Sequence, residues 1–254
     1  MISFMRRFVD FQMHLCNAFD RMLPEEYRVD GDNYFTSVVI PRYLKPKYRI
    51  YDLGGGKTPC LNLTQKKAAE IYIIGLDINQ TELDRAEKGI YDETICADIT
   101  SYQGNSDADL IICRALLEHV RNVDAAFKAI VSILKPGGCA LIFVPSKNAI
   151  YARLNILLPE GIKRKILFTL FPMAENHQGF RSYYHKCTPK DFKKIVNQYG
   201  LEMIDRKCFF ISSYFSFCFP IYLLWRLWIY IFRLIVGSQA AESFMVVLKK
   251  RFHE

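Results

Sequence analysis

Short apolar runs alternate with segments of helical spacing along most of the chain after residue 48. Unbroken apolar runs are typical of parallel strands that helices cover on both faces, and their alternation with helical segments predicts a parallel sheet. We therefore expect an α/β fold with a doubly wound, mostly parallel, seven-stranded sheet. The expected strands are residues 49–53, 71–76, 94–97, 109–113, 139–144, 201–205 and 243–248, and the expected helices are 59–70, 80–88, 122–134 and 191–199.

Two segments interrupt this rhythm, and both are apolar and basic. We expect residues 1–48 to form an N-terminal helical cap and residues 49–250 to form one domain, with insertions at 145–187 and 209–241. Residues 145–250 carry 16 Lys and Arg against 6 Asp and Glu, whereas the whole chain has a formal net charge of +8. A basic region implies an anionic partner, which can be nucleic acid, a phospholipid surface or a phosphorylated substrate.

The eight cysteines are scattered, and no two of them form a CxxC pair. A disulfide scaffold would be shorter and denser in cysteine, and a zinc site needs paired spacing, so we expect reduced thiols and a cytoplasmic protein. The first residues mix Arg6, Arg7 and Asp10 with apolar side chains. This pattern predicts no signal peptide.

Gly54, Gly55 and Gly56 follow the first expected strand and precede a helix. Backbone N–H groups and a helix N-terminus meet at such a turn, which makes it a nucleotide-binding arrangement. A P-loop does not fit, because the position of its first glycine falls on Tyr51. The dinucleotide fingerprint fits Gly54 and Gly56 but places Pro59 where the third glycine belongs.

A third interpretation of this loop agrees with four further motifs in the same order along the chain. The run Asp52–Thr58 (DLGGGKT) resembles the first motif of class I S-adenosylmethionine (SAM)-dependent methyltransferases, with Thr58 in place of the last glycine. The resemblance spans residues 52–138 and implies the Rossmann-like fold of that family, with SAM as the cofactor. The further motifs are Gly75–Ile78, Cys96–Ile99, Leu117–Val120 and Leu134–Gly138.

The resemblance also implies a role for individual positions. Gly54 and Gly56 would let the backbone approach the methionine end of SAM, because glycine has no Cβ. Asp52 would lie near the sulfonium and amino groups, Asp77 would bind the ribose hydroxyls, and Asp98 would bind the adenine amino group. The alternative role of each aspartate is that of a helix cap or turn residue. The remaining implied cofactor positions are Gly55 in the same loop, Ile78 and Ile99 beside the adenine ring, and Arg114 after the fourth strand.

Leu117–Val120 (LEHV) is similar to a segment of the quinone-biosynthesis branch of the family. Some of those enzymes hold a metal with two acidic residues and the histidine of this segment, but Ala115 replaces the first acid, so we expect no metal. His119 is a candidate general base, since its reference pKa of about 6.5 suits proton removal near neutrality. The alternative is a turn residue that lines the pocket. His177 and His185 are further candidates, and a dedicated base is dispensable where alignment dominates methyl transfer.

The most apolar stretch contains Pro220, which leaves 16 residues from Ile221 to Val236. At about 1.5 Å per residue, this is too short to cross a hydrocarbon core about 30 Å thick. A narrow polar stripe among apolar residues instead predicts a helix that lies in a membrane interface. Residues 150–171 and 4–22 are further candidates for membrane contact, and the alternative for all three segments is a lid, core packing or a dimer face. The polar stripe consists of Tyr222, Arg226, Tyr230, Arg233 and Gly237.

Both insertions are expected to emerge where ligands bind, outside the carboxyl ends of the parallel strands. We therefore predict a SAM-dependent methyltransferase, cytoplasmic and peripheral to the inner face of a membrane. Its acceptor is expected to be small and amphiphilic or lipid-linked: a quinone precursor, a lipid-linked glycan or a modified lipid.

The expected partners are this acceptor and an anionic membrane surface. Nucleic acid is not expected, because the sequence contains no recognisable RNA-binding module. One alternative is a soluble methyltransferase whose insertions form a lid or a homodimer face. The other is a non-catalytic, membrane-attached module on the same fold.

Overall fold

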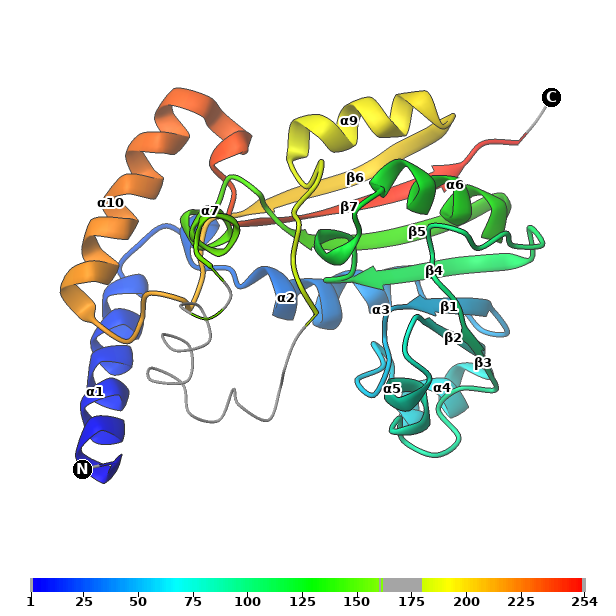
Figure 1. The fold of residues 1–254 in the computed structure, drawn as a ribbon, viewed down its shortest axis with the longest axis horizontal. Coiled ribbons are helices and arrows are strands. Elements are labelled where there is room, and N and C mark those ends of the chain that lie inside the picture. Colours follow the sequence, from blue (N-terminus) through cyan, green and yellow to red (C-terminus); the bar gives the residue numbers. More distant parts are fainter. Residues whose placement is uncertain (1, 160, 162–179, 253–254) are drawn as a thin grey trace.

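The computed structural model describes residues 2–159, 161 and 180–252 and contains one seven-stranded sheet (Figure 1). The strand order is β3-β2-β1-β4-β5-β7-β6, and β7 runs antiparallel to both of its neighbours, β5 and β6. The predicted doubly wound, mostly parallel sheet is therefore confirmed, with the last strand inserted beside the sixth. The strands are β1 (Arg49–Leu53), β2 (Tyr72–Asp77), β3 (Glu93–Cys96), β4 (Ala108–Arg114), β5 (Leu134–Pro145), β6 (Leu201–Phe209) and β7 (Ser243–Lys250).

The helices between the strands match the expected segments, but two of their bounds differ. The helix expected from Pro59 begins four residues later, because Asn62 caps it: its side chain accepts a hydrogen bond from the Gln65 N–H, and the Gln65 side chain reaches back to the Asn62 N–H. The helix expected over 80–88 ends at Asp84. These helices are α4 (Leu63–Ala69), α5 (Gln80–Asp84), α6 (Val123–Ile133) and α9 (Pro189–Gln198).

The fifth strand begins earlier than expected, at Leu134 rather than Cys139. Leu134 pairs with Ala108, and the pairing then shifts register before Cys139 meets Leu110. A Cβ on Gly138 would lie 2.7 Å from the Ala108 carbonyl oxygen, so only glycine allows this close approach of the two strands. The motif Leu134–Gly138 therefore forms the irregular start of β5.

Two apolar cores cover the two faces of the sheet. On one face, Phe127 of α6 and Phe192 of α9 pack edge to face at 5.4 Å between ring centroids. On the other face, short helices of the N-terminal segment bury Phe35 and Ile40 against the strands. These short helices are α2 (Gly31–Tyr34), the π-helical turn η2 (Phe35–Val39) and α3 (Ile40–Tyr43), preceded by η1 (Glu25–Tyr27).

Three further helices gather at the carboxyl end of the parallel strands, on the side to which the arrowheads of β4 and β5 point (Figure 1). A third apolar cluster joins two of them through Cys16 of α1 and Trp225 of α10. Both insertions therefore emerge at the predicted edge of the sheet. The helices are α1 (Ile2–Asp20), α7 (Ile150–Leu157) and α10 (Phe219–Val236), and the short turns η3 (Leu117–His119) and η5 (Gly237–Ala240) complete the described elements.

Two residues of the polar stripe of α10, Tyr222 and Arg226, do not face water, as a helix lying in an interface would require, whereas Tyr230 is 52% exposed. Tyr222 and Arg226 are buried against the protein, where both contact the carboxylate of Asp20 at the end of α1. Arg233 forms an ion pair with Glu26 at 2.8 Å. The outward face is apolar instead and consists of Ile221, Leu224, Leu227, Trp228, Ile231, Leu234 and Ile235.

The helix also begins earlier than the sequence suggested. Pro220 lies in its first turn, where proline is tolerated, so it starts the helix rather than dividing it. Among the described residues, one helical stretch, Phe219–Ala240, is long and apolar enough to cross a membrane by length and composition, with a mean hydropathy of 1.6.

Candidate functional site

Two cavities lie at the carboxyl edge of the sheet and share part of their walls. The first has a volume of about 640 Å³ and the second about 600 Å³, and both are lined by Gly54 and Ala115. Ala115 follows β4 and has a φ of +51°, a left-handed conformation that costs a non-glycine residue about 1–3 kcal/mol. Such strain at a junction of cavities is typical of a functional site.

The glycines after β1 are required by packing within the protein. A Cβ on Gly54, which has a φ of +71°, would lie 2.8 Å from the Leu116 side chain. A Cβ on Gly55 would lie 2.5 Å from the Asp52 carboxylate, and Gly56 has a φ of +46°. The loop can therefore adopt this shape only with glycine at these positions.

Asp52 lies beneath the loop and lines neither cavity, which differs from the expected place beside a sulfonium. Its Oδ2 accepts hydrogen bonds from the Cys60 N–H at 2.9 Å and from the Tyr91 hydroxyl at 3.4 Å. Burial raises its pKa to about 6, and these hydrogen bonds together with Arg114 offset only part of that rise. Asp52 therefore holds the loop to the sheet from below.

The first cavity brings together most of the predicted cofactor residues. Asp77 and Asp98 end adjacent parallel strands and both line it, with Ile78 and Ile99. The Asn79 N–H donates to Asp77 Oδ1 at 2.9 Å, and Thr100 donates to Asp98 Oδ1 from its N–H and its hydroxyl. Burial raises the pKa of Asp77. Each aspartate thus has a turn role as well as a place in the cavity wall.

Ile78 is a solvent-exposed residue of this wall, with 59% of its surface exposed beside the first cavity. An isoleucine so exposed at a cavity mouth offers an apolar face to a ligand ring. The wall therefore offers carboxylate oxygens to polar groups of a ligand and an isoleucine face to an apolar or aromatic one.

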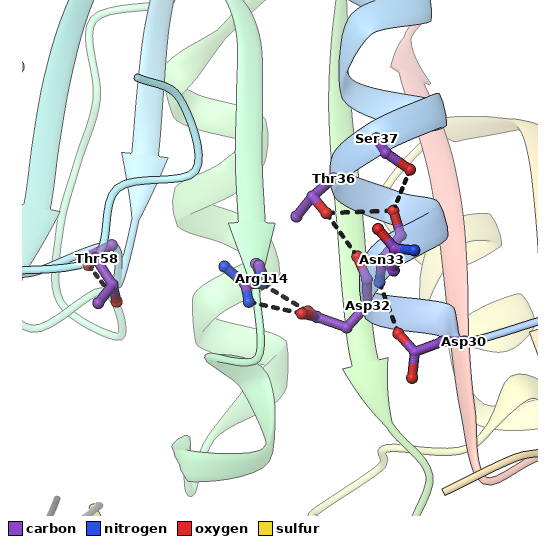
Figure 2. A network of polar contacts seen from close by, with 8 residues as sticks. Asp30, Asp32, Asn33, Thr36, Ser37, Thr58 and Arg114 are labelled. Carbon is purple, nitrogen blue, oxygen red and sulfur yellow. Dashed lines mark hydrogen bonds and ion pairs between the residues drawn. The ribbon is translucent and has the colours of Figure 1, made fainter. Parts of the chain in front are cut away.

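Arg114 lines the second cavity rather than the first. Its guanidinium binds Asp32 through two parallel hydrogen bonds, from Nε at 2.6 Å and from Nη2 at 2.7 Å (Figure 2). Asp30 caps the same short helix through the Asn33 N–H. Asp30 and Asp32 were not predicted from the sequence: a cap signature is visible there, but a partner 82 residues away is not.

His119 lies in the wall of the first cavity, and His185 does not join it. Its Nδ1 is 3.1 Å from the Arg181 carbonyl oxygen, and its Nε2 is 3.8 Å from Glu118 Oε1. Burial lowers the pKa of His119, while burial raises the pKa of Glu118 to about 8. His185 is exposed and lines neither cavity, and His177 lies outside the described residues.

The far wall of the second cavity comes from the two insertions. Tyr151 of α7 and Tyr214 stack at 4.1 Å between ring centroids, and the Tyr151 hydroxyl donates to the Glu242 carbonyl at 3.0 Å. Ser212 and Ser213 line the same wall. These residues were not predicted from the sequence, because no local pattern relates two tyrosines from separate insertions. Within the described part of the chain, no group of three His, Cys, Asp or Glu side chains is placed to hold a metal ion.

Comparison with known proteins identifies the family of the chain. A family model described as "Methyltransferase domain" matches residues 16–206. The ubiquinone biosynthesis O-methyltransferase of Azoarcus sp. (strain BH72) is 22% identical over 164 residues, or 62% of this chain, and the chain spans 65% of that relative's length.

Two solved structures establish the fold. A SAM-dependent methyltransferase from Archaeoglobus fulgidus has a TM-score of 0.54 at 16% identity, over 89% of this chain and 97% of that one. The [4+2]-cyclase SpnF has a TM-score of 0.54 at 19% identity, over 90% and 86% of the two chains. Since the family model covers most of the sequence, the chain belongs to the methyltransferase domain family and has the fold of its class I, SAM-dependent members.

Proposed function

We propose that this protein transfers a methyl group from SAM to a small, amphiphilic or lipid-linked acceptor at a membrane surface. The observation that carries the proposal is the pair of cavities that meet at Gly54 and Ala115, one at the predicted cofactor positions and one lined by the insertions. A cofactor in the first cavity and an acceptor in the second would meet at this junction.

The residues of the first cavity fit the adenosine part of SAM. Asp77 and Asp98 offer carboxylate oxygens at the two strand ends, and Ile78 and Ile99 offer apolar faces. When bound, SAM would supply an activated methyl group on a sulfonium. The contribution of the protein is then alignment, which alone can remove several kcal/mol of a barrier.

The second cavity supports an acceptor with a ring and polar substituents. Phe143 and the stacked pair Tyr151–Tyr214 offer aromatic faces, and Ser212 and Ser213 lie beside them. The Azoarcus relative is named for an O-methylation in ubiquinone biosynthesis, which favours a hydroxyl as the acceptor group. His119 stays a prediction as its base. Its Nδ1 lies 3.1 Å from the Arg181 carbonyl oxygen and 3.3 Å from Ser182 Oγ, and the tautomer that donates from Nδ1 to the carbonyl would accept a proton on Nε2.

The outward face of α10 supports action at a membrane. Leu224 is 70% exposed and Ile235 is 75% exposed, and large exposed apolar patches mark sites of interaction. Phe8 and Phe11 of α1 add exposed rings. The buried polar groups of α10 face the protein, and its apolar side chains face outward, where they can contact the hydrocarbon of a membrane. The basic residues in the second half of the chain would attract the protein to anionic lipid.

The proposal is tested in two stages. Vesicle flotation should recover the protein with vesicles that contain anionic lipid and less of it with purely zwitterionic vesicles. The double variant Leu224→Ser/Leu227→Ser should bind at least tenfold more weakly, because two exposed apolar side chains are lost from the face. Ile204→Ser is the control, since Ile204 is an exposed aliphatic residue on the edge strand β6 and not on α10.

Transfer itself is then measured with radiolabelled SAM and a total lipid extract. Label in the organic phase that requires the protein supports a lipid-like acceptor, and label in a water-soluble product contradicts it. Absence of flotation, with a dimer in solution that the double variant dissociates, would assign the α10 face to a second copy instead. The [4+2]-cyclase SpnF has a similar fold, so the fold alone does not imply methyl transfer. If the protein binds SAM but transfers no label to any acceptor, the proposed methyl transfer is contradicted.

A further inference from the structure

The wall of the first cavity carries charges of both signs. Asp77 and Asp98 line one part of it, which faces the adenosine of SAM in the proposed function. Arg121 and Arg181 line the same cavity, and both are exposed, so another part of the wall is basic and open to solvent. The adenosine of SAM has no anionic group, so this basic part of the wall is left for another ligand.

Tyr183 brings these two arginines together. The guanidinium carbon of Arg121 lies 4.8 Å from the centre of the Tyr183 ring, and that of Arg181 lies 5.5 Å from it. Such cation–π contacts hold a guanidinium by the charge distribution of the ring and leave N–H donors of its fork available. The two cations repel each other, and an anion bound by both would relieve that repulsion.

The segment that carries Arg181 and Tyr183 is fixed to the turn η3. The Glu118 carbonyl oxygen accepts hydrogen bonds from the Tyr183 N–H at 2.7 Å and from the Tyr184 N–H at 3.0 Å. The His119 Nδ1 lies 3.1 Å from the Arg181 carbonyl oxygen. Because the backbone is already held in this position, little further ordering is needed before the arginines bind a ligand.

Neither Arg121 nor Arg181 forms an ion pair with a carboxylate among the described residues. Two acidic side chains of the same region do not supply one: Asp124 forms an ion pair with Lys186, and Glu118 is buried. Burial raises the pKa of Glu118 to about 8, so this acid retains its proton near neutrality. Two exposed cations that share one ring at a cavity wall are therefore available to an anionic ligand.

We propose that Arg121 and Arg181 bind a phosphate group of the acceptor and that Tyr183 holds the two guanidinium groups in place. Guanidinium forks match the oxygens of a phosphate, and their charge-assisted hydrogen bonds are strong and directional. His119 and Ala115 continue the same wall, and Ala115 also lines the second cavity, so an acceptor held by its phosphate could extend to the junction. This assignment rests on the proposed function and deepens it, because it adds a phosphate to the amphiphilic acceptor.

Two alternatives are tested beside it: the arginines are only solvated surface groups, or they bind the phosphate of a membrane phospholipid. Inorganic phosphate and phenyl phosphate are titrated by calorimetry into the full chain saturated with S-adenosylhomocysteine. The ionic strength is kept constant, because salt screens exposed charges. The affinity for S-adenosylhomocysteine is measured separately for every variant.

Arg121→Gln and Arg181→Gln should each weaken the binding of both phosphates at least tenfold and leave S-adenosylhomocysteine within about twofold. Lysine at either position should recover part of the loss, since it keeps the charge but not the fork. Tyr183→Leu should give a smaller loss, because both arginines stay but lose the ring that orients them. Arg206→Gln is the matched control, since Arg206 is an exposed arginine of β6 that lines neither cavity.

Flotation with phosphatidylglycerol vesicles separates the two sources of phosphate. The double variant Arg121→Gln/Arg181→Gln should float as the wild type does, and its loss from the vesicles would assign the site to a lipid headgroup and contradict the acceptor.

Three further outcomes separate failure of the phosphate site from failure of the proposed function. A wild type that binds S-adenosylhomocysteine but neither phosphate would overturn the phosphate site. So would arginine variants that bind phosphate as tightly as the wild type or that lose S-adenosylhomocysteine to the same extent. A folded wild type that does not bind S-adenosylhomocysteine would instead overturn the proposed function.

Discussion

Glu242 is a carboxylic acid enclosed by protein at the turn into β7. It is 1% exposed, and burial raises its pKa to about 8, with Trp225 and Arg226 lowering it only in part. Its ordinary pKa is 4.5, so the folded protein retains this proton to a higher pH than the unfolded chain does. The free energy of unfolding should therefore fall as pH rises from about 4.5 to about 8. Above this range, Glu242 should cause no further decrease.

Replacement of Glu242 by Gln tests this at the scale of one residue. The variant keeps the shape and removes the titration, so we expect it to be more stable than the wild type by about 1–3 kcal/mol at pH 9 and to show a flatter dependence on pH. Urea unfolding at pH 5, 7 and 9 measures both. Glu202→Gln, on the exposed face of β6, is the control. Equal pH profiles for Glu242→Gln and the wild type would show that Glu242 is ionised throughout.

At the scale of elements, α10 is held to the body of the protein by buried polar side chains as well as by the apolar cluster that contains Trp225 and Ile229. Arg226 donates to the Phe210 carbonyl at 2.7 Å and to the Tyr27 carbonyl at 2.5 Å, and its Nε lies 3.3 Å from Asp20 Oδ1. All of these groups lie in or beside the contact between α1 and α10. Removal of one partner of a buried ion pair is costly, because the other charge stays buried without compensation.

Arg226→Met should therefore destabilise the protein by about 3–5 kcal/mol, because Asp20 would lose its cation and two carbonyls would lose their donors. Arg233→Met, on the same helix, removes an ion pair to Glu26, which is 54% exposed, and should cost no more than about 1 kcal/mol. Guanidinium unfolding of both variants gives the comparison. Similar small losses for the two would mean that Arg226 does not anchor α10.

The same element shows where prediction from sequence succeeds and where it stops. The strands and the glycine loop were predicted correctly, because apolar runs and glycine spacing are local signals. The helix expected from Pro59 began too early, since the capping pair Asn62 and Gln65 sets its start. The polar stripe of α10 was found, but Tyr222 and Arg226 in it are buried rather than turned to water, and Asp20, the partner of Tyr222, lies 202 residues away in the sequence.

The candidate site follows the same pattern. Asp77 and Asp98 were predicted together because each ends a strand, and parallel strand ends share one edge. The ion pair between Asp32 and Arg114, like the stack of Tyr151 on Tyr214, depends on contacts between segments far apart in the sequence. Pairings of this kind arise only when the chain is folded, so spacing and composition carry no signal for them.

At the scale of the whole molecule, the sheet provides one edge for everything the proposal requires. Both cavities open there, and α1, α7 and α10 gather at the same end (Figure 1). In the proposed function, α10 contacts the membrane, and an acceptor that leaves the membrane would reach the reaction site along the wall of the second cavity that the insertions form. This common edge is why cofactor binding, acceptor choice and membrane contact form one account.

SAM binding is the claim on which the other parts of this account depend. Calorimetric titration of SAM into the wild type, beside Asp77→Ala and the exposed control Asp84→Ala on α5, tests it directly. We predict micromolar binding by the wild type and the control, and at least tenfold weaker binding by Asp77→Ala, because the ribose hydroxyls would lose a carboxylate acceptor. A folded wild type that binds no SAM, or an Asp77→Ala variant that binds it as tightly as the wild type does, would contradict the account.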